Sequence, residues 1–214
     1  MKINLIILFI VCALNSFGQT VLEPKHTINV EVGLPVTMAN KTYKWMMQGV
    51  VNTSMYYQYR FPSSFAIGAG MNYSMATISI YKVKPSIKGL MYNIGGFVKI
   101  AHEKFYSETF GTDFALKIGY QQTTFKDSLL GKDYSSKSYS INSINMTPMV
   151  TFKLMADEAN SYGFTIGYTF NDYNFYPARL GFTPQGFTSE DFQGSTQFMT
   201  VGFSYTHYLG RKTE

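Results

Sequence analysis

The sequence predicts an all-β fold, an eight-stranded antiparallel up-and-down transmembrane β-barrel. Three observations support this fold class. Eight segments alternate apolar residues with small or polar ones, the charges inside them all fall on one phase of that alternation, and the connections between them alternate in length. The composition agrees, because charged residues make up 14% of the chain, where about a quarter is usual for soluble domains.

Residues 1–18 form a predicted signal peptide. They combine a basic start at Lys2, an apolar stretch over 5–14 and small residues at Ser16 and Gly18, the pattern that precedes signal cleavage. The apolar stretch is too short for a membrane-spanning helix, which needs about 20 residues. We therefore expect this segment to direct export and to be removed.

Cleavage is expected before Gln19, which leaves one barrel domain over 19–214. The only cysteine, Cys12, would leave with the signal peptide, so the mature chain would have no disulfide or thiol chemistry. A lipid anchor on Cys12 is not expected, because Val11 stands where such a site needs a small residue.

The eight alternating segments predict the strands. Most have at least the nine to eleven or so residues that a tilted strand needs to cross a bilayer. An even number of strands also lets the barrel close with both termini on one side. The segments are 26–34, 48–61, 65–78, 89–101, 110–121, 142–156, 162–171 and 196–209.

The third segment illustrates how the two faces differ. In FAIGAGMNYSMAT the apolar side chains alternate with glycine, alanine, serine and asparagine. A soluble barrel would carry lysine and glutamate on its polar face, whereas small residues suit the crowded interior of a narrow membrane barrel. The apolar phase is therefore expected to face lipid, and its representative members are Phe65, Ile67, Met71, Tyr73, Phe114, Leu116, Ile118, Val201 and Phe203.

The charged residues well inside the segments are predicted to line the lumen. A lysine or arginine on the lipid face at the midplane costs about 2–4 kcal/mol, which explains their absence from that face. Lys99, Asp113 and Lys153 are expected at similar depth near the periplasmic end. We interpret the set as a polar plug that neutralises buried charge, with a gate or solute path as the alternative. The members are Glu31, Arg60, Lys99, Asp113, Lys117 and Lys153.

The connections predict the orientation of the barrel. Short turns at 62–64 and 157–161 would lie on the periplasmic side, and by parity so would 102–109. Long loops on the other side are typical of outer-membrane barrels. The predicted outer loops are 35–47, 79–88, 122–141 and 172–195.

Aromatic and proline residues add three local expectations. Aromatics near the strand ends, such as Tyr57 on the periplasmic side and Tyr43 on the outer side, suggest two interfacial girdles. Pro148 inside a strand predicts a bulge. The aromatics of the last outer loop are expected either to fold over the barrel mouth or to form an adhesive surface; they are Tyr173, Phe175, Tyr176, Phe182, Phe187 and Phe192.

The stretches FAIGAGMNYSMAT, GGFVKIAHEKFYSETFGTDFALKIGYQ and GFSYTHYL resemble the small outer-membrane β-barrel domain family, the eight-stranded barrels of OmpA/OmpX and PorT type. The resemblance implies the outer membrane of a Gram-negative type cell and insertion by the barrel-assembly machinery through an aromatic C-terminal strand. Here that strand ends at Leu209 without a terminal phenylalanine. We expect a monomer surrounded by outer-membrane lipids.

The sequence offers little for catalysis or cofactors. The mature histidines are His26, His102 and His207, with no nucleophile elbow and no metal-ligand spacing. Ser204 and His207 would point to opposite faces of their strand. We therefore predict no catalytic, cofactor or metal residues, and no nucleic-acid binding, because the basic residues do not cluster. Ser128 lies in a candidate glycosylation motif, Asp-Ser-Leu, that short loops also contain by chance.

These observations predict a non-enzymatic outer-membrane barrel that anchors surface loops for envelope integrity or surface interaction. Two alternatives stay open. One is an outer-leaflet lipid-modifying enzyme of lipid A deacylase type, and the other is a narrow conduit or an accessory barrel of a secretion system.

Overall fold

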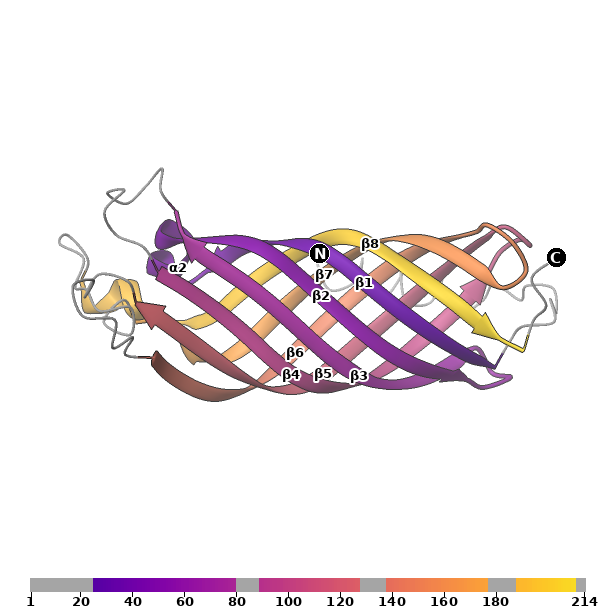
Figure 1. Ribbon diagram of the computed structural model, residues 1–214, viewed down its shortest axis with the longest axis horizontal. Coiled ribbons are helices and arrows are strands. Elements are labelled where there is room, and N and C mark those ends of the chain that lie inside the picture. Colours follow the sequence, from indigo (N-terminus) through magenta and orange to yellow (C-terminus); the bar gives the residue numbers. More distant parts are fainter. Residues whose placement is uncertain (1–24, 80–88, 128–137, 177–187, 211–214) are drawn as a thin grey trace, which may run out of the picture.

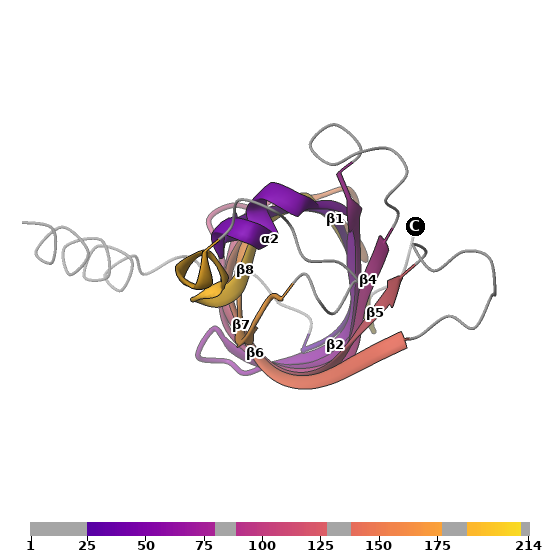
Figure 2. The ribbon, with the colours of Figure 1, turned by 90° about the vertical axis from the view of Figure 1, so that its left-hand side faces the viewer.

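The computed structural model describes residues 25–79, 89–127, 138–176 and 188–210. Eight antiparallel strands close into one barrel in chain order, with β8 paired to β1 (Figure 1). Viewed along its axis, the wall forms a closed ring (Figure 2). The strands are β1 His26–Ala39, β2 Met47–Arg60, β3 Phe65–Ile78, β4 Gly89–Phe105, β5 Phe110–Asp127, β6 Ser138–Met155, β7 Asn160–Asn174 and β8 Ser195–Leu209.

The two ends of the barrel differ. Short turns join β2 to β3, β4 to β5 and β6 to β7 at one end, here called the turn end, where the described chain also starts and finishes (Figure 1). The opposite end, the loop end, carries the long connections, the helix α2 (Lys41–Met46) and the 3-10 helix η2 (Ser189–Phe192). Among the described residues, no helix is long and apolar enough to span a membrane.

Several strands extend further than the sequence predicts, mostly toward the loop end. β5 continues to Asp127 and β6 already begins at Ser138, so that much of the predicted loop 122–141 belongs to the wall. The predicted loop 35–47 is wrong as well, because β1 continues to Ala39 and α2 follows. Pro35 lacks an N–H, yet the β1–β8 ladder continues through it, whereas the β1–β2 ladder stops two residues earlier, at Gly33.

The bulge predicted at Pro148 is also wrong. Pro148 lies opposite Leu116 in an uninterrupted ladder with β5. Its ladder with β7 has a gap of two unpaired residues, Thr147 and Pro148, after which pairing resumes in the same register. The missing N–H of proline is therefore accommodated by a local loss of pairing rather than by an inserted residue.

Two expected features lie outside the described residues. They are the signal peptide over 1–18 and the candidate glycosylation site at Ser128. Phe182 and Phe187 of the last outer loop lie outside as well.

Gly70 illustrates why small residues line the interior. A Cβ at Gly70 would lie 2.2 Å from the carbonyl oxygen of Met55 and 2.4 Å from Cβ of Tyr56. Gly70→Ala is therefore expected to lower the free energy of unfolding by about 1–3 kcal/mol, the usual cost of overpacking. Urea unfolding in lipid vesicles measures it. Gly167→Ala is the matched control, since its Cβ would meet its nearest atoms at 3.4 Å and should change stability little.

An apolar cluster fills the loop end of the barrel. Tyr43 of α2, Phe125 of β5 and Phe175 after β7 pack against one another, with the ring centroid of Phe175 lying 5.4 Å from that of Tyr43 and 6.1 Å from that of Phe125. We call this group the mouth cluster; its buried members are Tyr43, Met46, Met47, Ala76, Ile78, Met91, Phe125, Tyr173 and Phe175. The girdle position predicted for Tyr43 is therefore wrong, whereas Tyr173 and Phe175 do fold into the mouth.

Polar contacts fasten α2 to η2 at the rim of the mouth. Lys41 Nζ lies 2.7 Å from Asp191 Oδ1, and Thr42 Oγ1 donates a hydrogen bond to the Asp191 carbonyl oxygen over 2.9 Å. The Asn40 amide also donates to the carbonyl oxygens of Phe192 and Gly194. The first and last outer connections are thereby tied together over the seam between β1 and β8.

This rim contact predicts an acid-sensitive step. The hydrogen bond from Lys41, followed by that from the Thr188 backbone, holds the pKa of Asp191 below its ordinary value. The contribution of the Asp191 carboxylate to stability is therefore present above about pH 4, and it is lost as the pH falls through the pKa that Asp191 has in the folded protein. Fluorescence of Trp45, the single tryptophan, should report the loosening of α2 below about pH 4. Asp191→Asn should remove this step from the dependence of Trp45 fluorescence on pH. If the variant kept the same step below about pH 4, Asp191 would not be its cause.

Candidate functional site

The polar lumen is the candidate functional site. At the turn end, Lys99 of β4 lies 2.5 Å from Asp113 of β5, measured from Nζ to Oδ2. Lys153 of β6 lies 3.8 Å from the same carboxylate oxygen and forms a shorter ion pair with Glu103. Arg60 Nε lies 3.8 Å from Glu103 Oε2, and its Nη2 donates to the Glu103 carbonyl oxygen. The structure thus brings Lys99, Asp113 and Lys153 together.

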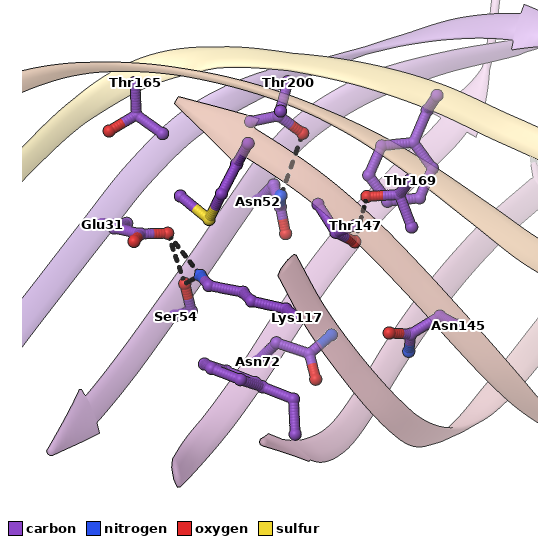
Figure 3. Close-up of a pocket in the computed structure, with 14 residues that line it drawn as sticks. Glu31, Asn52, Ser54, Asn72, Lys117, Asn145, Thr147, Thr165, Thr169 and Thr200 are labelled. Atoms are coloured by element: carbon purple, nitrogen blue, oxygen red, sulfur yellow. Dashed lines mark hydrogen bonds and ion pairs between the residues drawn. The ribbon is translucent and has the colours of Figure 1, made fainter. Parts of the chain in front are cut away.

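A second part of the network lies nearer the middle of the barrel. Lys117 Nζ lies 2.6 Å from Glu31 Oε2 and donates to Ser54 Oγ over 2.9 Å. Ser54 Oγ in turn donates to Glu31 Oε2 (Figure 3). Glu31 on β1 and Lys117 on β5 therefore meet across the lumen, so that this pair connects opposite parts of the wall.

Tyr56 joins the two parts. Its hydroxyl accepts a hydrogen bond from Lys99 over 2.9 Å and donates one to Glu31 over 2.7 Å. Lys99 and Lys117 lie directly opposite each other in the β4–β5 ladder, with their ammonium groups 4.6 and 4.8 Å from the centre of the Tyr56 ring. The ring offers both cations its negative face, which reduces the cost of placing two like charges side by side.

Burial makes the pairing of these charges necessary. The Lys99 side chain is 0% exposed and that of Asp113 1%. An isolated ion in such surroundings is strongly destabilising, whereas a pair with further hydrogen bonds is tolerated. The lumen network contains the cations Arg60, Lys99, Lys117 and Lys153 and the carboxylates Glu31, Glu103 and Asp113.

Sequence reasoning missed two members of this network, Glu103 and Tyr56. Glu103 lies beyond the predicted end of its strand at 101, although it continues the inward phase of Lys99 and Ala101. Tyr56 lies on the inward phase of β2 between Ser54 and Gln58, but an uncharged tyrosine there gives no sign that it joins two ion pairs. Following the alternation until it fails would have revealed Glu103.

Above the network lies a chamber of about 50 Å³ (Figure 3). Such a volume has room for about three or four water molecules. Eight of its fourteen lining residues carry an amide or hydroxyl group, and Asn52 Nδ2 donates to Thr200 Oγ1 over 2.9 Å. Its lining is Glu31, Asn52, Ser54, Asn72, Phe97, Lys117, Asn145, Thr147, Met149, Thr165, Gly167, Thr169, Phe198 and Thr200.

The histidines lie away from this lumen network. His26 shares a hydrogen bond with the exposed Tyr57, and His207 Nδ1 lies 3.0 Å from Asn160 Oδ1 at the turn end. His102 stacks edge-on against Phe65, with ring centroids 5.3 Å apart. Within the described ranges, no group of three or more histidine, cysteine, aspartate or glutamate residues is placed to hold a metal ion.

The side chains predicted to face lipid lie on the outside of the wall. Phe203 is 72% exposed and Met71 66%. Among the described strand residues, the outward phase carries charge only near strand ends, at Lys104 at the turn end, which is buried, and at the exposed Lys126 and Asp172 at the loop end. The other predicted positions are exposed or half-buried: Phe65, Ile67, Tyr73, Phe114, Leu116, Ile118 and Val201.

Fold and site together define the class of small eight-stranded barrels of outer-membrane type, with a closed wall, an apolar exterior and a polar lumen. No protein-family model matches the chain, and no curated protein matches it by sequence. Among solved structures, it is similar to neisserial surface protein A, NspA, with a TM-score of 0.52, 6% identity and coverage of 86% of this chain and 97% of that one.

Two further barrels are similar at lower scores. Ail of Yersinia pestis gives a TM-score of 0.41 at 9% identity, and the N-terminal β-barrel domain of Pseudomonas aeruginosa OprF gives 0.42 at 7%. Each comparison covers 86% of this chain and 99% of the other. At such identities the likeness concerns the fold alone.

Proposed function

We propose that the chain is an integral outer-membrane β-barrel of a Gram-negative type envelope, exported by a signal peptide and inserted by the barrel-assembly machinery. In this proposal it is a monomeric, non-enzymatic protein whose rigid wall anchors the outer connections for surface interaction or envelope integrity. The observation that carries it is the apolar exterior, which keeps charge at the strand ends and surrounds a polar, ion-paired interior.

The distribution of outward charge supports the membrane location. A cation at the bilayer midplane costs about 2–4 kcal/mol, and the cost falls toward the interfaces. Lys104 and Lys126 lie near opposite strand ends, where this cost is small, and exposed apolar side chains fill the wall between them. A soluble barrel would have no reason to exclude charge from this central band.

The filled interior supports an anchoring role rather than a conduit. The ion-paired network occupies the turn end, the mouth cluster occupies the loop end, and the chamber between them is about 50 Å³. Eight strands leave just enough width for side chains to fill the lumen. A passage along the axis would have to displace buried ion pairs and packed aromatic rings.

Cell fractionation combined with heat-modifiability tests the location and fold. The protein is expected in the outer-membrane fraction, with a gel mobility that changes on heating as the barrel unfolds. Recovery in a soluble fraction would contradict the proposal.

Lipid analysis and conductance test the role. A deletion strain should keep its lipid A acylation pattern, and the purified protein should give no steady conductance in planar bilayers. Altered acylation would favour a lipid-modifying enzyme, and open channels would favour a conduit.

A further inference from the structure

The ladder between β6 and β7 is interrupted in a way that differs from the other described ladders. Pairing runs from Met155 to Met149, is absent at Pro148 and Thr147, and resumes at Met146 in the same register. Elsewhere in the described barrel, an irregularity within a ladder shifts the register, as between Thr37 and Ala39. The β6–β7 gap is therefore a local loss of backbone pairing between two strands that remain aligned.

Glycine contacts at this gap are looser than at two other glycines of the wall. A Cβ on Gly95 or Gly202 would lie 2.4 or 2.3 Å from a carbonyl oxygen of the neighbouring strand. At Gly167 the corresponding distance, to the Pro148 carbonyl oxygen, is 3.8 Å. The strands approach less closely here than at those two glycines.

The gap has an inner and an outer side. Inside, the hydroxyls of Thr147 and Thr169 lie 2.9 Å apart and join β6 to β7 across the unpaired interval (Figure 3). Outside, Pro148 is exposed and, in the same register, lies opposite the half-buried Tyr168. Since proline has no N–H, no backbone hydrogen bond can be donated from this position to β7.

The chamber lies directly behind this gap. Five of its lining residues come from the two strands that border the gap, namely Thr147, Met149, Thr165, Gly167 and Thr169. Toward the turn end the chamber meets the Glu31–Lys117 pair, and toward the loop end the interior is filled by the mouth cluster. The interrupted β6–β7 ladder thus borders the chamber on its side.

We propose that the β6–β7 seam at Pro148 is a lateral portal, through which small neutral molecules dissolved in the bilayer enter the chamber and bind there. At this point one pair of threonine hydroxyls joins the strands, in a stretch of two residues that lacks backbone pairing. The portal goes beyond an anchoring function and does not require the axial lumen to conduct.

The residues that line the chamber indicate which class of ligand would bind there. Asn52, Asn72 and Asn145 offer amide groups, and Asn72 Oδ1 is buried without a hydrogen-bond partner in the described structure. Phe97 and Phe198 add apolar surface. Glu31 and Lys117 already neutralise each other, so the site offers no free charge to an ionic ligand. A compact neutral molecule with hydroxyl or amide groups fits this chemistry.

The test introduces a thiol into the chamber, in a Cys12→Ser chain that is refolded into liposomes. Thr169→Cys places the thiol at the gap, and Thr165→Cys places it in the paired stretch opposite Thr151, on the same chamber. The probes are methyl methanethiosulfonate, which is neutral and enters bilayers, and its cationic trimethylammonium-ethyl analogue. Mass spectrometry gives the rate of modification.

The neutral probe is expected to modify both thiols. Pro148→Ala restores a backbone N–H and should slow both reactions about fivefold, because one additional backbone hydrogen bond makes local opening about fivefold less favourable. Val150→Ala is the matched control, because Val150 is the next outward residue of β6 and lies in the paired stretch opposite Ile166; it should leave both rates unchanged. The cationic probe should react with neither thiol.

Three results would overturn the portal. Rates that do not respond to Pro148→Ala would exclude the seam as the route, and equal reaction with the cationic probe would indicate an aqueous axial route. Slowing at position 169 alone would mean that the seam frays without admitting molecules to the chamber. Heat-modifiability of every variant establishes that the barrel has formed.

Discussion

Glu103→Gln is expected to lower the free energy of unfolding by about 3–5 kcal/mol, the usual result of removing one partner from a buried ion pair. Glu103 is 1% exposed and is the direct partner of Lys153. It also lies within 3.8 Å of Arg60. Glutamine keeps the size and one hydrogen-bond acceptor but removes the charge, so two buried cations would lose a compensating carboxylate. Urea unfolding in lipid vesicles, followed by the heat-modified gel shift, measures the loss.

Glu108→Gln provides the matched control for this change. Glu108 lies in the turn between β4 and β5, five residues along the chain from Glu103, and is exposed. The same loss of one carboxylate there should leave stability almost unchanged, because exposed charges are screened and solvated. Equal effects at 103 and 108 would contradict a structural role for the lumen network.

The sequence-based predictions succeeded where they depended on strict alternation. The wall of β3 could be predicted residue by residue, because FAIGAGMNYSMAT changes face at every step and a strand has a period of two. The same reasoning placed Lys99, Asp113 and Lys153 on one side of the wall. It could not show which ammonium group meets which carboxylate, since this depends on the stagger of strands that are distant in sequence.

Other features could not be predicted because they depend on convergence in space. Tyr43, Phe125 and Phe175 come from three separate segments, and the mouth cluster exists only because all three point to one axis. Pro148 in the sequence predicts the loss of one backbone hydrogen bond. Whether the strand then forms a bulge or leaves two residues unpaired depends on how β7 pairs on either side, which the sequence of β6 does not show. Contacts between neighbouring strands at equal depth are therefore predictable, whereas contacts across the lumen and irregularities of pairing are not.

The interior suggests why this barrel can be both narrow and highly charged. Lys99 and Lys117 are forced to lie opposite each other by the register of β4 and β5. Their ammonium groups diverge to Asp113 and Glu31, and the Tyr56 ring lies close to both. Each ion pair connects two strands, so the same contacts that neutralise charge also hold the wall closed.

Met71→Arg is expected to make folding into a bilayer less favourable by about 2–4 kcal/mol, the cost of arginine on the lipid face at the midplane. Met71 lies at the centre of β3, and its side chain is 66% exposed on the outer wall. The long arginine side chain would therefore replace an apolar contact with lipid by a cation far from either interface. Folding titrations into lipid vesicles measure the change.

Phe61→Arg is the matched comparison, because Phe61 follows the last residue of β2 at the turn end and is also exposed. Arginine near an interface costs only about 0–1 kcal/mol, so the two variants should differ although both replace an exposed apolar side chain with the same cation. If the exterior faced water, the two substitutions would change the free energy of folding by similar amounts. A large difference between the centre and the end of the strand therefore requires a solvent that varies with depth, and equal, small effects at both positions would remove the basis for placing this exterior in lipid.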